Sequence, residues 1–188
     1  MKTYLDKNVY EAALERIAYC FQEFDNVLVA FSGGKDSGVL LNLCYNYADE
    51  HGLLDKLTMY HLDYEAQYQM TTEYVTRTFL EQFPGIRKMW YCVPIKAQSA
   101  CALGEPYWTP WDAAKKKLWV RAMPENPYVV HEGNLDVPFR HGMVDYEFQD
   151  KLSRHFAKKR GTTAVMVGLR ADESLSLIHI SEPTRLRR

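Results

Sequence analysis

The chain has 188 residues, of which 47% are hydrophobic and 25% are charged, an ordinary composition for one globular domain. Its net charge of −1 provides no overall field that would attract nucleic acid or an anionic membrane. No apolar run approaches the length of a membrane span, and the four cysteines show no paired spacing, so we expect a cytoplasmic protein with reduced thiols.

Hydrophobic periodicity predicts that helices and strands alternate along the chain. Helices are expected over residues 8–24, 37–50, 67–83 and 145–160, and strands over residues 26–31, 56–62, 87–93 and 163–169. Residues 95–144 are rich in proline and are expected to be irregular. Because alternation of this kind requires right-handed crossovers, it indicates a doubly wound α/β fold with a parallel sheet. Ligands bind such sheets beyond the carboxyl ends of the strands.

A short polar loop joins the first expected strand to the second expected helix. Its residues are Ser32, Gly33, Gly34, Lys35, Asp36 and Ser37. Glycine permits a positive φ, which lets successive backbone N–H groups converge, and the helix N-terminus adds partial positive charge. Together with the ammonium group of Lys35, these features predict a site for phosphate or sulfate. The spacing matches neither the G-x-x-x-x-G-K-[ST] P-loop nor the G-x-G-x-x-G dinucleotide motif.

Two later segments place polar residues directly after expected strands. In the His-Leu-Asp segment at 61–63, the Asp63 carboxylate can hold Mg²⁺ or a ribose hydroxyl, or it can cap the next helix. In the Gly-Leu-Arg segment at 168–170, Gly168 lets the backbone approach a ligand, and the planar guanidinium of Arg170 suits phosphate or sulfate oxygens. The alternative for Arg170 is a surface ion pair with a neighbouring carboxylate.

These motifs together resemble the phosphoadenosine phosphosulfate (PAPS) reductase family of the PP-loop, or adenine nucleotide α-hydrolase-like, superfamily. The S-G-G-x-D-S loop, the H-x-D segment and the G-[IL]-R segment occur in the family's order, over residues 26–174. In detail the chain is similar to a bacterial subgroup of IbrA-like proteins. The resemblance implies a three-layer HUP-type fold that binds an adenine nucleotide, PAPS or ATP, at the loop and the two later segments. It also implies catalytic roles for Lys35, Asp36 and Arg170, with Mg²⁺ at Asp63 and no flavin or haem.

The resemblance leaves three functions open. In a sulfonucleotide reductase, a cysteine thiolate attacks the sulfur of PAPS, and known reductases carry this cysteine in an E-C-G-x-H segment that the sequence lacks. In an ATP pyrophosphatase, a substrate oxygen attacks the α-phosphorus, which activates the substrate for thiolation. A regulatory protein would bind the nucleotide without turnover and act with a ParB-like partner, as IbrA-like members do. Residues 65–68 depart from the T-G-x-x-F-P-E-T pattern of assimilatory reductases, which leaves the substrate undecided.

The cysteines of the chain are not arranged for catalysis. Cys20 and Cys44 lie on the apolar faces of expected helices, and Cys92 ends an expected strand, so each is expected to pack as a small hydrophobic residue. Only Cys101, in the irregular segment, is expected to be exposed enough to react.

The irregular segment and the strand before it contain every tryptophan of the chain: Trp90, Trp108, Trp111 and Trp119. These side chains can form a lid over adenine, a stacking platform for unpaired nucleic acid bases, or a small core beneath a long loop. The basic triplets at 115–117 and 158–160 are expected to be solvated.

The last residues of the chain are not expected to belong to the domain. Residues 175–188, Leu-Ser-Leu-Ile-His-Ile-Ser-Glu-Pro-Thr-Arg-Leu-Arg-Arg, are identified as the in-frame translation of a transposon-end adapter used in sequencing libraries. We therefore expect one PP-loop domain over residues 1–174, truncated at its C-terminal end, followed by a non-native tail. The alternative is a native strand-like tail.

Overall fold

A computed structural model describes residues 6–99 and 104–169 of the chain. Its helices are α1 (Val9–Glu23), α2 (Lys35–Glu50), α3 (Gln69–Glu81) and α4 (Asp145–Arg160). Its strands are β1 (Asn26–Ala30), β2 (Leu57–Leu62), β3 (Arg87–Cys92), β4 (Ala97–Gln98), β5 (Tyr107–Trp108), β6 (Val129–His131) and β7 (Thr163–Val167). Two short 3₁₀ helices, η1 (Leu54–Lys56) and η2 (Ala113–Leu118), precede β2 and follow β5. The tail expected at 175–188 lies outside the described residues.

Every helix and strand expected from the sequence is present, and α4 has its expected bounds. The other bounds shift by one or two residues, and the main differences concern the start of α2 and the short strands β4, β5 and β6 in the segment expected to be irregular. Helix α2 begins at Lys35, directly after its N-cap Gly34, so the lysine belongs to the first helical turn. Strand β6 was not expected, because three residues in a proline-rich segment are too few to show a period of two.

The main sheet has five parallel strands in the order β6-β3-β2-β1-β7. Strands β2, β3 and β6 follow β1 on one side, and the chain then returns through α4 to place β7 on the other side of β1. The direction of strand order therefore reverses between β1 and β7. This arrangement confirms the doubly wound α/β fold, and it locates the switch point beside the polar loop that follows β1.

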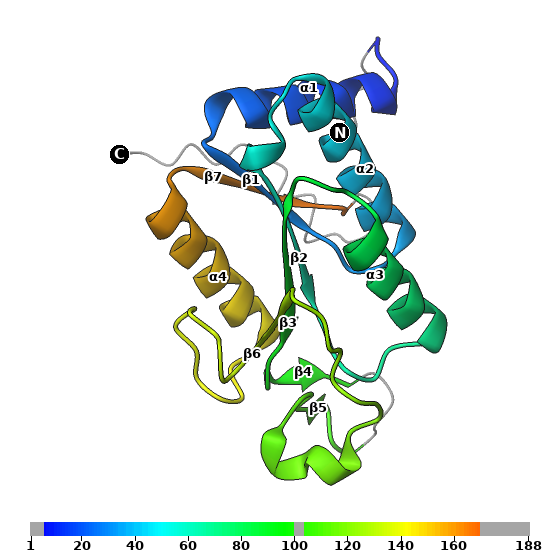
Figure 1. Ribbon diagram of the computed structural model, residues 1–188, viewed down its shortest axis with the longest axis vertical. Coiled ribbons are helices and arrows are strands. Elements are labelled where there is room, and N and C mark those ends of the chain that lie inside the picture. The colour runs from blue at the N-terminus through cyan, green and yellow to red at the C-terminus, as the bar shows by residue number, and fades with distance from the viewer. Residues whose placement is uncertain (1–5, 100–103, 170–188) are drawn as a thin grey trace.

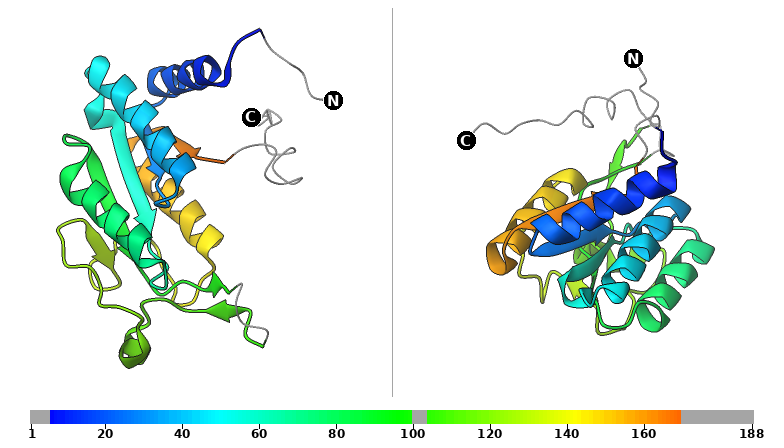
Figure 2. Two further views of the ribbon diagram at one scale, coloured as in Figure 1. Left: turned by 90° about the vertical axis from the view of Figure 1, so that its right-hand side faces the viewer. Right: turned by 90° about the horizontal axis from the view of Figure 1, so that it is seen from above.

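Helices cover both faces of the sheet, which gives three layers (Figure 1). Alternate residues of β1 point to opposite faces: Val27 and Val29 pack in one apolar cluster with Phe79 of α3, whereas Leu28 packs in another with Phe148 of α4. Helix α1 joins the first cluster and lies against α2 (Figure 2). Because both faces of the sheet are covered, β1 and β2 are buried along almost their whole length and are mainly apolar, with Asn26, Thr58 and His61 as buried polar residues.

The segment between β3 and α4 lies mainly beyond the carboxyl ends of β2 and β3, where β4, β5 and η2 are seen below the sheet in Figure 1. Strands β4 and β5 pair with each other in a separate two-stranded sheet. Strand β6 instead returns to the main sheet and pairs with β3 through the register Trp90 to Val129. In the part of the chain that the structure describes, no helix is long and apolar enough to cross a membrane.

Candidate functional site

The loop after β1 makes a tight turn that requires glycine at one position. Gly33 has a φ of +81°, and a Cβ atom there would lie 2.7 Å from Cγ2 of Val75, so both the backbone and the packing against α3 exclude a side chain. Gly34 has an extended backbone, with φ of −85°, so it does not need a positive φ. The expectation that the glycine pair makes the turn is therefore met by Gly33.

Two serine hydroxyls hold the loop in shape. The Ser37 hydroxyl accepts from the backbone N–H of Ser32 at 3.1 Å and donates to the Gly34 carbonyl oxygen at 3.0 Å. The Ser32 Oγ lies 2.9 Å from the Ser37 Oγ and accepts from the backbone N–H of Gly34 at 3.2 Å. Ser37 is buried, so its hydroxyl bonds within the loop, whereas Ser32 is exposed and its hydroxyl is accessible to solvent. These hydrogen bonds within the loop preorganise its backbone.

A cleft of about 220 Å³ opens beside this loop at the switch point. Ser32 and Ser37 line it from the loop, and Gly168 lines it from the end of β7. A Cβ atom on Gly168 would lie 2.8 Å from the backbone nitrogen of Ser37 and 2.9 Å from the carbonyl of Asp36. Because those are backbone atoms, only glycine lets the end of β7 approach the first turn of α2 so closely. The close neighbour of Gly168 in the fold is the helix itself, and the approach of this backbone to a ligand stays a prediction.

Two tyrosines close the α4 side of the cleft. The Tyr60 hydroxyl donates to Oε1 of Gln149 at 3.0 Å, and the Tyr64 hydroxyl donates to Oδ2 of Asp145 at 2.9 Å. Burial raises the pKa of Tyr60 to about 12, and burial together with the Asp145 carboxylate raises the pKa of Tyr64. Both phenols are therefore neutral near neutral pH, and the wall keeps a fixed hydrogen-bonding pattern.

The charged residues of the loop do not all face this cleft. The first backbone N–H groups of α2 have no acceptor within the helix, and Lys35 is exposed in the same turn. Asp36 lines a different groove, which is formed with Arg16 of α1 and the end of β7. The catalytic role of Asp36 therefore stays a prediction. Arg170 lies outside the described residues, so its predicted place in the cleft stays a prediction.

Asp63 is at the carboxyl end of β2 as the sequence predicted, but its side chain is fully buried. Its Oδ2 accepts from Nε1 of Trp90 and from Nη2 of Arg121, both at 2.7 Å, and its Oδ1 accepts from the backbone N–H of Glu65 at 2.8 Å and from Arg121 Nη2 at 2.6 Å. These donors occupy both oxygens. The prediction that Asp63 binds a ribose hydroxyl or Mg²⁺ therefore does not agree with the structure.

A magnesium ion does not fit the residues that are present. Mg²⁺ needs carboxylate oxygens that are free to coordinate, and the guanidinium of Arg121 already neutralises the charge of Asp63. Residues 6–99 and 104–169 contain no group of three histidine, cysteine or acidic side chains that could hold a metal ion.

The Asp63 cluster anchors the segment between β3 and α4. Glu65, whose φ is +64°, accepts from the backbone N–H groups of Trp111 at 2.8 Å and Val120 at 2.7 Å. Arg121 donates to the Glu65 carbonyl oxygen at 2.9 Å, and Trp111 donates from Nε1 to the Asp63 carbonyl oxygen at 2.9 Å. Two acidic residues after β2 thus fix a segment that is distant in the sequence.

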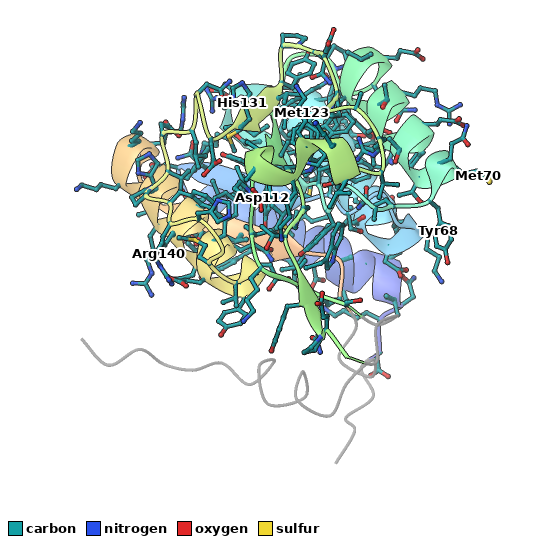
Figure 3. All side chains as sticks on the ribbon, turned by 90° about the horizontal axis from the view of Figure 1, so that it is seen from below. Tyr68, Met70, Asp112, Met123, His131 and Arg140 are labelled. Carbon is teal, nitrogen blue, oxygen red and sulfur yellow. The ribbon has the colours of Figure 1, made fainter. Side chains whose placement is uncertain are left out.

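Of the three alternatives for the tryptophans, burial in a core is the one observed, but the core is the apolar cluster of the sheet that also contains Val27 and Phe79 rather than a separate small one. Trp90 and Trp111 are fully buried, and Trp119 packs edge-on against Trp111 with ring centroids 5.2 Å apart. Seen from the carboxyl ends of the strands, η2 crosses the molecule with the labelled Asp112, Met123 and His131 on the segments around it (Figure 3). Neither buried ring is free to stack on a base.

The cysteines within the described ranges are unsuited to nucleophilic attack. Burial raises the pKa of Cys44 to about 12, and burial followed by the Asp63 carboxylate raises that of Cys92. Burial also raises the pKa of the half-buried Cys20. Because the thiolate is the nucleophile, a raised pKa disfavours attack by these thiols near neutral pH. Cys44 and Cys92 are buried in the apolar core, as the sequence predicted. Cys101 lies outside the described residues.

Sequence reasoning missed the wall of the cleft and the partner of Asp63. Tyr60, Tyr64 and Gln149 belong to no motif, although Tyr64 directly follows Asp63 at a strand end where ligands are expected. Arg121 gives no signal, because it is one of many charged residues in a segment without periodicity.

A parallel three-layer domain with a glycine loop at its switch point belongs to the doubly wound class of α/β domains. Within this class, the model of the phosphoadenosine phosphosulfate reductase domain family matches residues 26–181, so the chain belongs to that family. It is also 32% identical over 172 residues to the uncharacterized protein YbdN of Escherichia coli strain K12. The match covers 90% of this chain and 40% of YbdN, so the chain spans well under half the length of that relative.

Proposed function

We propose that this protein binds an adenine nucleotide, PAPS or ATP, with its phosphate or phosphosulfate groups at the loop Ser32–Ser37. The observation that carries the proposal is the cleft at the switch point, which the preorganised loop borders on one side and Gly168 on the other. Ligands of doubly wound domains bind at this position. Family membership supports the same ligand class.

The loop offers the chemistry that such anions need. The free N–H groups in the first turn of α2 point out of the helix N-terminus, where its dipole favours negative charge. The exposed Lys35 adds a mobile positive charge, and the Ser32 hydroxyl is open to solvent. Charge that develops on a transferred phosphoryl or sulfonyl group would be stabilised here without rearrangement of the backbone.

The reaction at the bound nucleotide depends on its attacking group. Reduction of PAPS requires a thiolate that attacks sulfur, while the bond between sulfur and the phosphate oxygen breaks and adenosine 3′,5′-bisphosphate leaves. Cys20, Cys44 and Cys92 are poorly suited to supply this thiolate, because none of them lines the cleft and burial raises the pKa of each. A reductase activity would therefore use a thiol from elsewhere, whereas attack of a substrate oxygen on the α-phosphorus of ATP needs none from this part of the chain.

Calorimetry with PAPS and with ATP tests the binding site. Lys35→Ala should weaken binding by about tenfold or more, because it removes one of the charges nearest the anion. Ser37→Ala should also weaken binding, since it removes the hydroxyl that joins Ser32 to Gly34. Lys151→Ala and Ser153→Ala on the outer surface of α4 are the matched controls and should bind as the unchanged protein does. Equal affinity in all five proteins would reject the loop as the site.

Product analysis then separates the reactions. Release of AMP and pyrophosphate from ATP identifies a pyrophosphatase, and release of adenosine 3′,5′-bisphosphate from PAPS with a dithiol identifies a reductase. Tight binding of either nucleotide without any product supports the regulatory alternative, in which a ParB-like partner recognises the protein with its nucleotide bound.

A further inference from the structure

A second cavity, of about 410 Å³, lies on the α4 face of the sheet at the end opposite the loop. Arg87, the first residue of β3, lines it from the sheet, and Lys159 and Arg160, in the last turn of α4, line it from the helix. Met89, Phe156 and other apolar side chains complete its wall. The cavity thus combines an apolar wall with a basic rim.

The positive charge at this rim is only partly balanced. Asp136 Oδ2 accepts from Nζ of Lys159 at 2.8 Å, and this hydrogen bond holds the pKa of the Asp136 carboxyl below its usual range. The Asp136 carboxylate is therefore already paired with Lys159. Among the described residues, neither Arg87 nor Arg160 has a carboxylate within 4.0 Å.

Arg87 has an especially poor set of partners for a half-buried guanidinium. Its hydrogen bond in the described part of the chain runs to Oγ1 of Thr58 at 3.4 Å, the long end of the normal range. Burial and the nearby charge of Arg160 both lower the pKa of Arg87. Nε2 of His155, also on the cavity wall, is buried without a hydrogen-bond partner and lies 3.6 Å from Asp136.

Helix electrostatics explain only part of this arrangement. Lys158, Lys159 and Arg160 stand at the C-terminus of α4, where cations complement the helix dipole. Arg87 comes from a strand and gains nothing from that dipole. Arg87 and Arg160 line one cavity, and in the described part of the chain neither has a carboxylate within 4.0 Å. Such a pair suits an anion, because a guanidinium binds phosphate, sulfate and carboxylate through two parallel hydrogen bonds.

We propose that this cavity binds a small organic anion, with a phosphate, sulfate or carboxylate head between Arg87 and Arg160 and an apolar body against Met89 and Phe156. The site is separate from the loop Ser32–Ser37 and does not depend on the nucleotide proposed there. Asp136 opposes the anion through its negative charge, and Lys159 limits this repulsion by pairing with it.

Phenyl phosphate and inorganic phosphate are suitable probes, titrated into ¹⁵N-labelled protein and followed by amide shifts in NMR spectra. Saturable shifts at residues 87 and 160 are expected, with phenyl phosphate the tighter ligand because it also covers the apolar wall. Arg87→Gln should weaken binding by about tenfold, and Asp136→Asn should strengthen it by about two- to fivefold. Arg160→Gln provides a second loss variant at a more exposed position, which serves if Arg87→Gln fails to fold.

Two controls make the result specific. Lys158→Gln removes an exposed charge in the same helical turn that does not line the cavity, and it should leave the affinity unchanged. Lys35→Ala should also leave it unchanged, which separates this cavity from the loop. Absence of saturable shifts, an equal loss in Lys158→Gln, or weaker binding in Asp136→Asn would each overturn the proposal.

Discussion

The Asp63 carboxylate and the Arg121 guanidinium are 58 residues apart in the sequence, and their Oδ1 and Nη2 atoms are 2.6 Å apart in the fold. Asp63 is fully buried, whereas the Arg121 side chain keeps 21% of its surface exposed. The sequence located the acid at the end of β2 and interpreted it as a ligand group or a helix cap. In the fold its side chain and carbonyl oxygen hold the segment that carries Trp111 and Arg121.

Replacement of Arg121 by glutamine should destabilise the protein strongly. The substitution leaves the buried Asp63 charge without its cation, a change that costs about 3 kcal/mol or more in a buried pair. Urea denaturation measures the loss. Arg154→Gln is the matched control, because Arg154 pairs with Asp150 on an exposed helical face and should contribute less than about 1 kcal/mol. Similar losses in the two variants would show that the Asp63 pair is not the anchor.

His61 should make stability depend on pH. Burial lowers its pKa, and its Nδ1 donates to the Phe31 carbonyl oxygen at 2.7 Å, so it is neutral in the fold. The unfolded chain binds a proton on this residue below about pH 6.5, so the free energy of unfolding should fall as the pH drops through that value. His61→Asn keeps a donor for Phe31 but does not titrate. Between about pH 6.5 and about pH 5.5, this substitution should reduce the slope of the free energy of unfolding against pH by up to about 1.4 kcal/mol per pH unit.

Urea denaturation at several pH values compares the two proteins. Parallel slopes for His61→Asn and the unchanged protein would contradict the linkage to this histidine. Asp136 does not confuse the comparison, because the lowered pKa of its carboxyl means that its contribution is lost only in more acidic solution.

At the scale of elements, the end of β7 and the start of α2 form one unit around the cleft. Their contact depends on Gly168, where a Cβ atom would lie 2.8 Å from the Ser37 backbone nitrogen. Gly168→Ala should therefore move one element away from the other. We expect a loss of about 1–3 kcal/mol in the free energy of unfolding, with a fall in nucleotide affinity of more than about tenfold.

Thermal or urea unfolding and calorimetry with ATP or PAPS test this contact. Gly104→Ala is the control, because no atom lies within 4 Å of a Cβ at Gly104 and its φ is not positive. Affinity that survives in Gly168→Ala while stability falls would show that the contact serves the fold alone.

Across the whole molecule, the two apolar clusters meet at β1 and β2, which have neighbouring strands on both sides. Val27, Leu28 and Met59 are fully buried, whereas Val165 and Val167 of the edge strand β7 are 43% and 53% exposed. Local unfolding should therefore begin at β7 rather than at the central strands.

Native-state amide hydrogen exchange, read by NMR, tests this order. The amides of β1 and β2 should exchange at least about a hundredfold more slowly than those of β7, because their exchange requires global unfolding. Protection in β7 equal to that in β1 would show that the edge unfolds only with the whole domain.

The sequence by itself determined the α/β class, the bounds of α4 and the position of the loop, because hydrophobic periodicity and glycine turns are properties of neighbouring residues. It also located Gly168 and Asp63 at strand ends. The strand β6 was not predicted, because its three residues are too few to show the alternation that identifies a strand.

Only the tertiary structure decided what the side chains at those strand ends do. It buried Asp63 against Arg121, turned Asp36 toward α1, and built the cleft wall from Tyr60 and Gln149, which lie 89 residues apart. Such pairs depend on how successive crossovers stack helices and strands, and no local pattern records that geometry. The sequence therefore specified where ligand chemistry can occur, whereas packing specified which polar groups remain free to perform it.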